Sequence, residues 1–406
     1  MKRFLILFFS MFLTFNVFAQ LHLSYEKVEV TLENAADAVR SLTAPVELEV
    51  SGIMMPLSKG DFGDLVSEIR AQKNLIRLNL SKVEGLKEIE SETFKDCTSL
   101  ISVILPDKVT KIGDRGFSNC SNLASVIIPD SVTTIGDYAF ELCSSLISVI
   151  IPNSVTYIGN NAFFKCCNLA TIIIGSNVTY IGIGAFSDCS SLINVAIPGC
   201  ATIGVSAFSG CKKLIEFYVD GNNSKYSSSD DRKILFNKDK TTLIAYPSAT
   251  GNIVIPSSVT TIGLNAFMDC SNMTSITIGD NLITIEDGVF FKCENLRNVT
   301  IPDSVASIGH FVFGDCESLK YNEYDNGLYL GNTENPYLVL IKLKNENITL
   351  CEVNNKTKII GNYVFFCCKK LKTVNYKGTA EQWKKISIGL NNEYLTNATI
   401  NYNYRE

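Results

Sequence analysis

The side chains that most enzymes use for acid–base chemistry are scarce in this sequence. Its 406 residues include 14 Cys but only 2 His, which are His22 and His310. His310 occupies a position at which segments of similar sequence have Asp137 or Asn160, and this favours a solvent-facing role. Triads that depend on His and metal sites that contain His are therefore not expected, and no catalytic residue is predicted.

Cysteine is the one reactive residue type that recurs in a pattern. Ten of the 14 Cys lie in the phrase Phe-x-x-Cys-x-x-Leu, with Met replacing Leu once: Cys97, Cys120, Cys143, Cys166, Cys189, Cys211, Cys270, Cys293, Cys316 and Cys368. A zinc site would need Cys-x-x-Cys pairs, which the sequence lacks. We therefore expect buried free thiols that act as small apolar spacers, and neither a metal site nor a cofactor. Disulfides between neighbouring copies of the phrase, which could stack about 5 Å apart, are the alternative.

A pair of acids, Asp230-Asp231, lies in a Ser-rich stretch that we interpret as a loop. Carboxylates suit hard cations such as Ca²⁺, but a solvated loop accounts for the pair without a ligand. The glycines mostly follow Ile at a repeated position, so they indicate a bend of the chain and not a phosphate-binding loop.

The cysteine phrase recurs at a fixed interval. Its first four steps are 23 residues long, and the fifth is 22 because the turn around residues 198–200 is one residue shorter. Two later steps are longer, from Cys211 to Cys270 and from Cys316 to Cys368. A period of about 20 to 29 residues indicates a solenoid of stacked coils, in which neighbours share one continuous core.

Each coil begins with a short strand. Val126 and Ile128 are two residues apart and should both face inward, while Ile127 between them faces out. Pro129 ends this strand because it has no N–H for a ladder bond. Residues 132–135 are rich in β-branched types and predict a second short strand.

The second half of the coil is predicted to turn back. Gly136 should permit a sharp bend, and residues 137–142 fit a single helical or 3₁₀ turn. Within that turn Ala139 is small where coils crowd, and Phe140 should fill the middle of the core.

The repeated phrase Ile128-Pro-Asp-Ser-Val-Thr-Thr-Ile-Gly-Asp-Tyr-Ala-Phe140, which returns near Ile151, Ile255 and Ile301, resembles the BspA-like family of bacterial leucine-rich repeats. The resemblance extends from about residue 75 to the C-terminus. It implies a β-rich α/β solenoid of leucine-rich-repeat coils with two terminal caps. It also implies surface-exposed or secreted proteins, several of which act as adhesins for host matrix proteins or other cells, without catalytic residues.

Residues 1–19 have the three parts of a signal peptide. Two basic residues precede an apolar run over 4–15, and Val17-Phe18-Ala19 places small residues before the expected cleavage at Gln20. A membrane anchor is the alternative, but about 12 apolar residues are fewer than the roughly 20 that a membrane span requires. We therefore expect export to the cell surface or the medium.

The repeat and its interruptions predict the domain organisation. After the signal peptide we expect an N-terminal cap with an atypical first coil (20–93), repeats (94–211), a hairpin insertion (212–254), repeats (255–316), a second insertion (317–358), and a last repeat with a C-terminal cap (359–406). Phe62, Leu65, Val66 and Ile69 predict a helix in the first cap, because they follow i, i+3, i+4, i+7 spacing. A capping box beginning at Thr379 predicts a short helix in the C-terminal cap.

The out-facing position of the first strand has unusual composition. We define the outer stripe as Ile104, Ile127, Ile150, Ile173 and Tyr218, which hold this position in successive coils except for Ala196 before Tyr218. Four stacked exposed isoleucines would form an apolar patch where a polar face is expected, and this favours a binding surface. The alternative is that the ladder only stabilises the sheet through neighbour contacts.

Charge and composition narrow the function further. The formal net charge of −5 and the absence of a basic run argue against nucleic acid or anionic membranes as partners. The preferred interpretation is a secreted or cell-surface protein that binds another protein, such as an adhesin. A self-assembling or envelope-associated module without a host ligand is the alternative, and an enzyme is the least favoured class.

Overall fold

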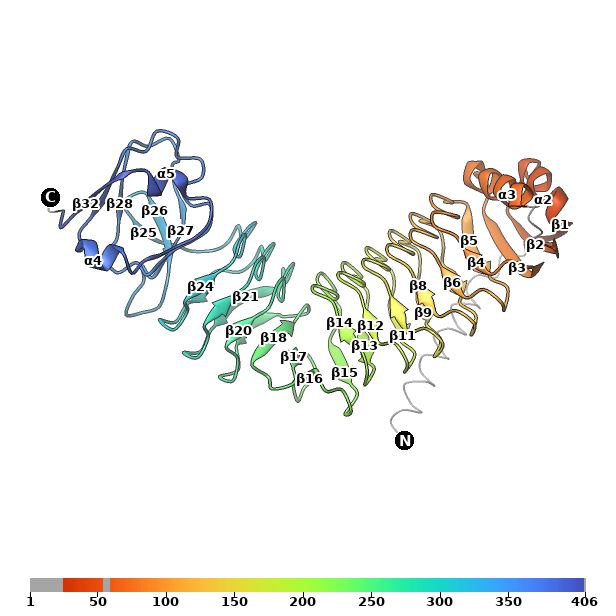
Figure 1. Cartoon of the computed structure of the whole chain (residues 1–406), viewed down its shortest axis with the longest axis horizontal. Coiled ribbons are helices and arrows are strands. Elements are labelled where there is room, and N and C mark those ends of the chain that lie inside the picture. The colour runs from red at the N-terminus through yellow and green to blue at the C-terminus, as the bar shows by residue number, and fades with distance from the viewer. Residues whose placement is uncertain (1–24, 54–58, 405–406) are drawn as a thin grey trace. The chain divides into compact units, whose positions relative to one another are not determined.

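The computed structural model describes residues 25–53 and 59–404, so the predicted signal peptide and His22 lie outside it. The chain divides into two compact units, Met1–Lys233 (unit 1) and Ile234–Glu406 (unit 2). Each unit is a solenoid in which short strands are joined by turns (Figure 1). The boundary falls inside residues 212–254, which the sequence analysis assigned to a hairpin insertion.

Unit 1 begins with parallel strands joined by helices. Strand β1 (Glu26–Thr31) pairs in parallel with β2 (Val46–Ile53), which pairs with β3 (Ile76–Glu84). The connecting helices are α2 (Leu32–Arg40) and α3 (Lys59–Ala71). The helix predicted from apolar spacing is confirmed in α3, because Phe62, Leu65, Val66 and Ile69 are all buried.

The coils that follow place their strands in two rows. The first row continues from β3 through β5 (Leu100–Ile104), β7 (Ser125–Ile127), β9 (Ser148–Ile150), β11 (Thr171–Ile173), β13 (Asn194–Ile197) and β15 (Glu216–Val219). The second row is a parallel sheet of β4 (Glu88–Ile89), β6 (Lys111–Ile112), β8 (Thr134–Ile135), β10 (Tyr157–Ile158), β12 (Tyr180–Ile181) and β14 (Thr202–Ile203). Strand β16 (Tyr226–Ser228) is the last strand of unit 1. The inward and outward positions agree with the prediction, since Val126 is buried and Ile127 is exposed.

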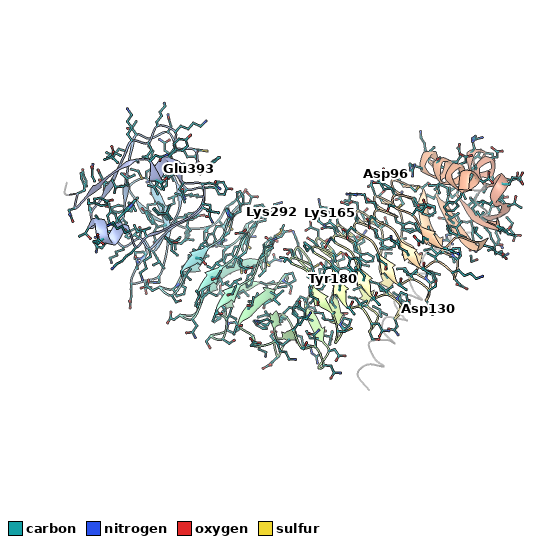
Figure 2. The ribbon with its side chains drawn as sticks, in the orientation of Figure 1. Asp96, Asp130, Lys165, Tyr180, Lys292 and Glu393 are labelled. Carbon is teal, nitrogen blue, oxygen red and sulfur yellow. The ribbon has the colours of Figure 1, made fainter. Side chains whose placement is uncertain are left out.

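The third side of each coil differs from the prediction. Residues 137–142 form successive turns and not a helical turn, because Tyr138 and Leu142 both adopt φ of 58°. Their N–H groups donate to the next coil, from Tyr138 to the Asn160 carbonyl and from Leu142 to the Phe164 carbonyl, each at 2.8 Å. Corresponding residues repeat along one edge of unit 1, where Figure 2 labels Asp96 and Lys165. The helical prediction was wrong because these bonds join residues 22 positions apart. Bonds between coils leave no signal in the local sequence that would distinguish such turns from a helical turn.

A column of phenylalanine rings fills the centre of the unit 1 coils. Rings of successive coils stack with centroids 5.0 to 5.3 Å apart from Phe94 through Phe117, Phe140 and Phe163 to Phe186. All five side chains are fully buried. The prediction that this Phe fills the core is confirmed.

The ten cysteines of the repeated phrase, here called the ladder cysteines, lie beside this column. All 14 cysteines are free, and the ten of the repeated phrase are buried. Seven of these ten thiols donate hydrogen bonds to the Phe carbonyl of the preceding coil, as in Cys143 to Phe117 and Cys166 to Phe140, each at 3.1 Å. The thiol therefore does more than fill space, because it also satisfies a carbonyl in the core.

We expect eleven thiols to resist labelling in the folded protein and three to react at once. Burial raises the pKa of Cys97 to about 12 and that of Cys316 to about 11, so these thiols stay protonated and unreactive at neutral pH. Cys167, Cys200 and Cys367 are exposed. Mass spectrometry after iodoacetamide treatment, with and without denaturant, measures the difference. Rapid modification of Cys143 in the folded state would contradict the structure, as would a disulfide between neighbouring ladder positions.

Unit 2 combines coils with antiparallel hairpins. Its first ladder contains β17 (Leu235–Asn237), β18 (Thr242–Ala245), β20 (Thr261–Ile262), β22 (Thr284–Ile285) and β24 (Ser307–Ile308), and beside it lie β19 (Gly251–Val254), β21 (Met273–Thr277) and β23 (Asn298–Thr300). The second contains β25 (Asn322–Tyr324), β26 (Gly327–Leu330), β27 (Val339–Leu343), β29 (Ile359–Ile360) and β31 (Ser387–Ile388), beside β28 (Leu350–Val353), β30 (Thr373–Tyr376) and β32 (Thr399–Tyr402). The pairs β17–β18, β25–β26 and β26–β27 are antiparallel.

The end of unit 2 carries two short helices, α4 (Ala380–Trp383) and α5 (Glu393–Thr396). The predicted capping box is confirmed, because the Thr379 side chain accepts from the Gln382 backbone N–H and the Gln382 side chain accepts from the Thr379 N–H. Trp383 is buried against Tyr376, with ring centroids 5.1 Å apart.

Candidate functional site

The outer stripe lies on the outward face of the first strand row of unit 1. Ile104 is in register with Ile127, and Ile150 with Ile173. The exposed fractions of Ile127 and Ile150 are 49% and 53%, while Ile104, Ile173 and Tyr218 are half-buried. The outward orientation follows from strand alternation, because the neighbouring Val126 and Val149 are buried. No described part of the chain covers the centre of the stripe.

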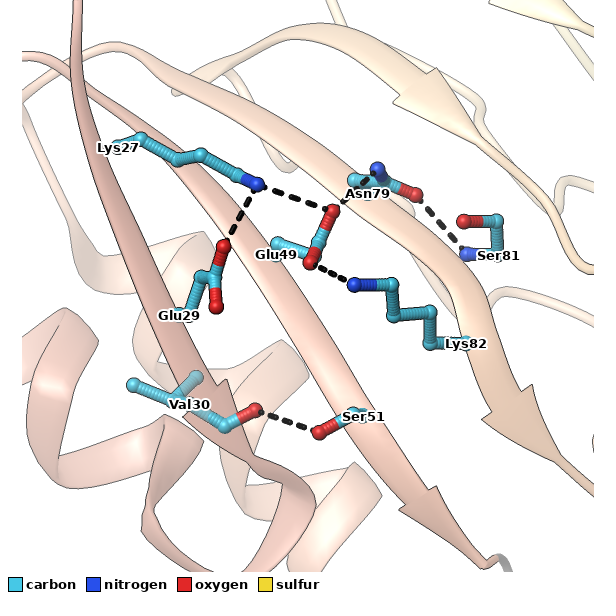
Figure 3. Close-up of polar contacts among 8 residues, drawn as sticks. All are labelled: Lys27, Glu29, Val30, Glu49, Ser51, Asn79, Ser81 and Lys82. Atoms are coloured by element: carbon cyan, nitrogen blue, oxygen red, sulfur yellow. Dashed lines mark hydrogen bonds and ion pairs between the residues drawn. The ribbon is translucent and has the colours of Figure 1, made fainter.

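A group of charged residues bounds the stripe at its N-terminal end. In register before Ile104 come Asn79 and Glu49. The Glu49 carboxylate accepts hydrogen bonds from Lys82 and, at 3.3 Å, from Asn79, and it lies 3.5 Å from Lys27 Nζ (Figure 3). The bond from Lys82 is the main reason why the pKa of Glu49 is lowered. The apolar stripe therefore ends at a carboxylate that stays ionised and paired.

The other end is bounded by an aromatic residue. Tyr218 is in register with Ala196, and its hydroxyl donates to the Glu216 carboxylate. The guanidinium of Arg232 lies over its ring, 4.7 Å from the centroid. The hydrogen bond to Glu216 is the main reason why the pKa of Tyr218 is raised. An apolar centre between polar ends is the arrangement found in protein–protein interfaces.

The structure adds exposed apolar residues that the sequence analysis missed. Ile193 and Ile215 are 41% and 49% exposed, one residue before the strands β13 and β15. They hold the position occupied by the buried Ala124, three coils before Ile193 and four before Ile215. In the sequence, each of them is an apolar residue directly after the repeated Leu. The sequence alone does not show at which repeats this residue is exposed and at which it is buried.

The corresponding face of unit 2 is mostly polar. Thr277 and Thr300, which hold the position of the stripe isoleucines, lie in register and are exposed. Val254, which precedes them in register, is 71% exposed and is the apolar exception among these three residues. The long apolar row is therefore specific to unit 1 and is not a requirement of the coil.

The side chains considered for chemistry do not form a reactive site. His310 is half-buried against Tyr363, with ring centroids 5.3 Å apart, so it is less solvent-facing than predicted. Asp231 accepts from the Ser229 hydroxyl at 2.6 Å and lies 3.6 Å from Lys233 Nζ. Within residues 25–53 and 59–404, no group of three or more His, Cys, Asp or Glu side chains is placed to hold a metal ion.

None of the helices that the structure describes has both the length and the apolar character of a membrane span.

Comparison with known proteins gives consistent matches. The family described as BspA type leucine rich repeat region matches residues 87–215, 245–333 and 342–405, in 6 copies. A leucine-rich cell surface protein from Faecalibacterium prausnitzii is 28% identical, with a TM-score of 0.58 over 78% of this chain and 82% of that one. The pneumococcal vaccine antigen PcpA is 21% identical and has the same fold, with a TM-score of 0.53 over 75% of this chain and 80% of that one. No curated protein matches the chain.

Proposed function

Because this chain belongs to the family of BspA-type leucine-rich-repeat proteins, we propose that it is a secreted or cell-surface protein that binds other proteins. Its binding surface is the outer stripe of unit 1. The observation that carries this assignment is the exposure of Ile127 and Ile150 in the middle of an apolar row with polar ends. A protein that is similar at 28% identity is described as a cell surface protein, which supports the location.

The exposed area is sufficient to contribute measurably to binding. Fully burying an Ile side chain is worth about 1.5 to 3 kcal/mol, so covering the exposed half of Ile127 or Ile150 is worth about 1 kcal/mol each. Central contacts usually dominate the binding energy, because the surrounding rim excludes water from them. The partner class that we propose is a host matrix protein or a surface protein of another cell, which makes the chain an adhesin.

Changing Ile127 and Ile150 together to Lys should weaken binding by more than about 2 kcal/mol, close to a thirtyfold loss. Both side chains point away from the core, so circular dichroism and the unfolding midpoint should stay close to those of the parent. Surface plasmon resonance against immobilised fibronectin, laminin and collagen measures the change for whichever protein the parent captures.

Thr277→Lys with Thr300→Lys is the matched control. It adds the same charges at the equivalent position of unit 2 and should leave binding unchanged. A folded Ile127→Lys/Ile150→Lys variant that binds as tightly as the parent would exclude the stripe. Sedimentation velocity distinguishes the proposed function from the self-assembly alternative. A self-assembling module would form concentration-dependent oligomers, and the Ile127→Lys/Ile150→Lys variant would abolish them.

A further inference from the structure

In unit 2 one coil is missing on the turn side of the solenoid. Where coils are consecutive, N–H groups at alternate turn positions donate to carbonyls of the next coil. The bonds run from Gly288 to His310, from Phe290 to Val312 and from Lys292 to Gly314, at 2.8 to 2.9 Å. The second insertion follows this coil, and its strand β27 pairs with β29 of the coil after the insertion, where Gly361 donates to the Leu340 carbonyl at 2.9 Å. The insertion supplies no turn of its own between residues 309–316 and 361–368.

The first wall of this gap carries unused donors. By position in the coil, the N–H groups of Phe311, Phe313 and Asp315 are equivalent to those of Gly288, Phe290 and Lys292. Within the described residues they have no acceptor. Phe313 is only 8% exposed, and an unpaired N–H in so buried a residue is costly.

The second wall carries the complementary acceptors. The carbonyls of Asn362, Val364 and Phe366 occupy the positions that accept from a preceding coil elsewhere, and no described N–H donates to them. Other features stop at the same place. The Phe column ends with the Phe290–Phe313 stack at 5.5 Å, and the Cys368 thiol has no carbonyl partner among the described residues, unlike the thiol of Cys316.

Between the walls lies a pocket of about 250 Å³. Its apolar lining includes Phe313, Tyr321, Ile341 and Val364. A cavity of about 150 Å³ accommodates benzene, whereas drug-sized ligands need roughly 300 to 1,000 Å³. The pocket therefore matches one phenyl-sized side chain.

We propose that this gap binds a peptide segment of a partner protein, which takes the place of the missing turn. Its carbonyls accept from the donor wall, its N–H groups donate to the acceptor wall, and one large apolar side chain enters the pocket. Donors and acceptors at every second residue match the pairing of successive turn segments elsewhere in the solenoid, such as that of residues 288–292 with residues 310–314. A small molecule could fill the pocket but would not satisfy both walls.

Exposed apolar residues on the two walls and next to them support an apolar partner. Phe311 and Phe366 are 69% and 50% exposed, and Leu390 is 65% exposed. Phe311 and Tyr363 adopt φ of 49° and 61°, a conformation that favours Gly or Asn and is unusual for aromatic residues. Their rings stack on each other with centroids 6.0 Å apart, and an entering segment can pack against the aromatic surface that they form.

The protein's own repeat provides the probe. A fluorescent peptide of residues 109–119 contains the Gly113-Asp-Arg-Gly-Phe117 turn, has no Cys, and forms these same bonds within unit 1. Anisotropy titration against the full chain should give a dissociation constant of about 100 µM. The same peptide with Phe117→Asp should bind at least about tenfold more weakly, because it loses the contacts of the phenyl ring with the apolar part of the pocket lining.

Hydrogen exchange locates the binding site. The amides of Phe311, Phe313 and Asp315 should exchange rapidly in the free chain and at least about tenfold more slowly with peptide bound. Those of Gly288, Phe290 and Lys292 should be protected in both states, because the next coil already pairs them.

A pair of variants keeps the test independent of folding. Phe311→Asn with Tyr363→Asn removes the rings but places a residue that tolerates positive φ, so folding should be retained while binding falls at least about tenfold. Tyr138→Asn makes the same change in unit 1 and should leave binding unaltered. Slow exchange at residues 311–315 in the free chain, absence of binding at millimolar peptide, or protection elsewhere would each overturn the proposal. None of these results depends on the outer stripe.

Discussion

Replacing Phe163 by alanine is expected to lower the free energy of unfolding by about 3 to 5 kcal/mol. The ring is fully buried and stacks on Phe140 and Phe186, with centroids 5.2 and 5.3 Å away and planes within 10°. Truncation leaves a cavity that neighbouring coils cannot close, because each coil is held to the next by backbone bonds such as that from the Phe163 N–H to the Ala185 carbonyl. The loss therefore includes the cavity as well as the transfer of the ring.

The adjacent residue provides the control. Phe164 has the same side chain but is half-buried on the outside of the turn, with Lys165 Nζ 5.0 Å from its ring centroid. Phe164→Ala should cost about 1 kcal/mol or less. Urea unfolding followed by circular dichroism compares the two, because Trp383, the single tryptophan, lies in unit 2 and its fluorescence would not report on unit 1. Equal losses for both variants would show that the Phe column does not hold the coils together.

Replacing Gly159 by alanine should cost about 3 kcal/mol or more, although it adds only one methyl group. A Cβ at this position would lie 2.5 Å from the Asp137 backbone nitrogen and closer still to the Gly136 carbonyl carbon. These contacts are with backbone and not with a side chain that could rotate away. The Gly159 N–H is bonded to the Ile135 carbonyl at 2.8 Å, so relief requires separating two coils.

Gly221 is the matched control for this prediction. An added Cβ there would have no neighbour within 4 Å, and its backbone does not adopt positive φ. Gly221→Ala should change the free energy of unfolding by about 1 kcal/mol or less, in either direction. If Gly159→Ala unfolds at the same urea concentration as the parent, the coils have more room between them than the structure shows.

The sequence by itself determined the features that depend on side-chain pattern. Strand alternation correctly predicted that Ile127 and Ile150 face outward, because successive side chains of a strand point to opposite faces whatever lies beyond it. The 23-residue period placed the Phe column and the ladder thiols in the core. Apolar spacing identified helix α3, and the capping box at Thr379 is a local motif of four residues.

Other features were decided only by contacts between coils. The turn over residues 137–142 was predicted to be helical, yet its N–H groups at positions 138, 140 and 142 bond to the following coil. Gly136 was expected to permit a bend, but its φ is not positive. It is required because the backbone around Asp114 approaches too closely for a Cβ. The exposure of Ile215 likewise depends on which neighbouring coils cover it.

The gap between residues 309–316 and 361–368 is the clearest case of the second kind. Both segments carry the ordinary repeat phrase, so nothing in either sequence distinguishes them from a closed pair of coils. Their donors and acceptors are left unpaired because the insertion continues the strands of the solenoid but not its turns. A residue pattern specifies which side chains enter the core. Where each backbone N–H finds its acceptor depends on which coil becomes its neighbour, and only the folded chain decides that.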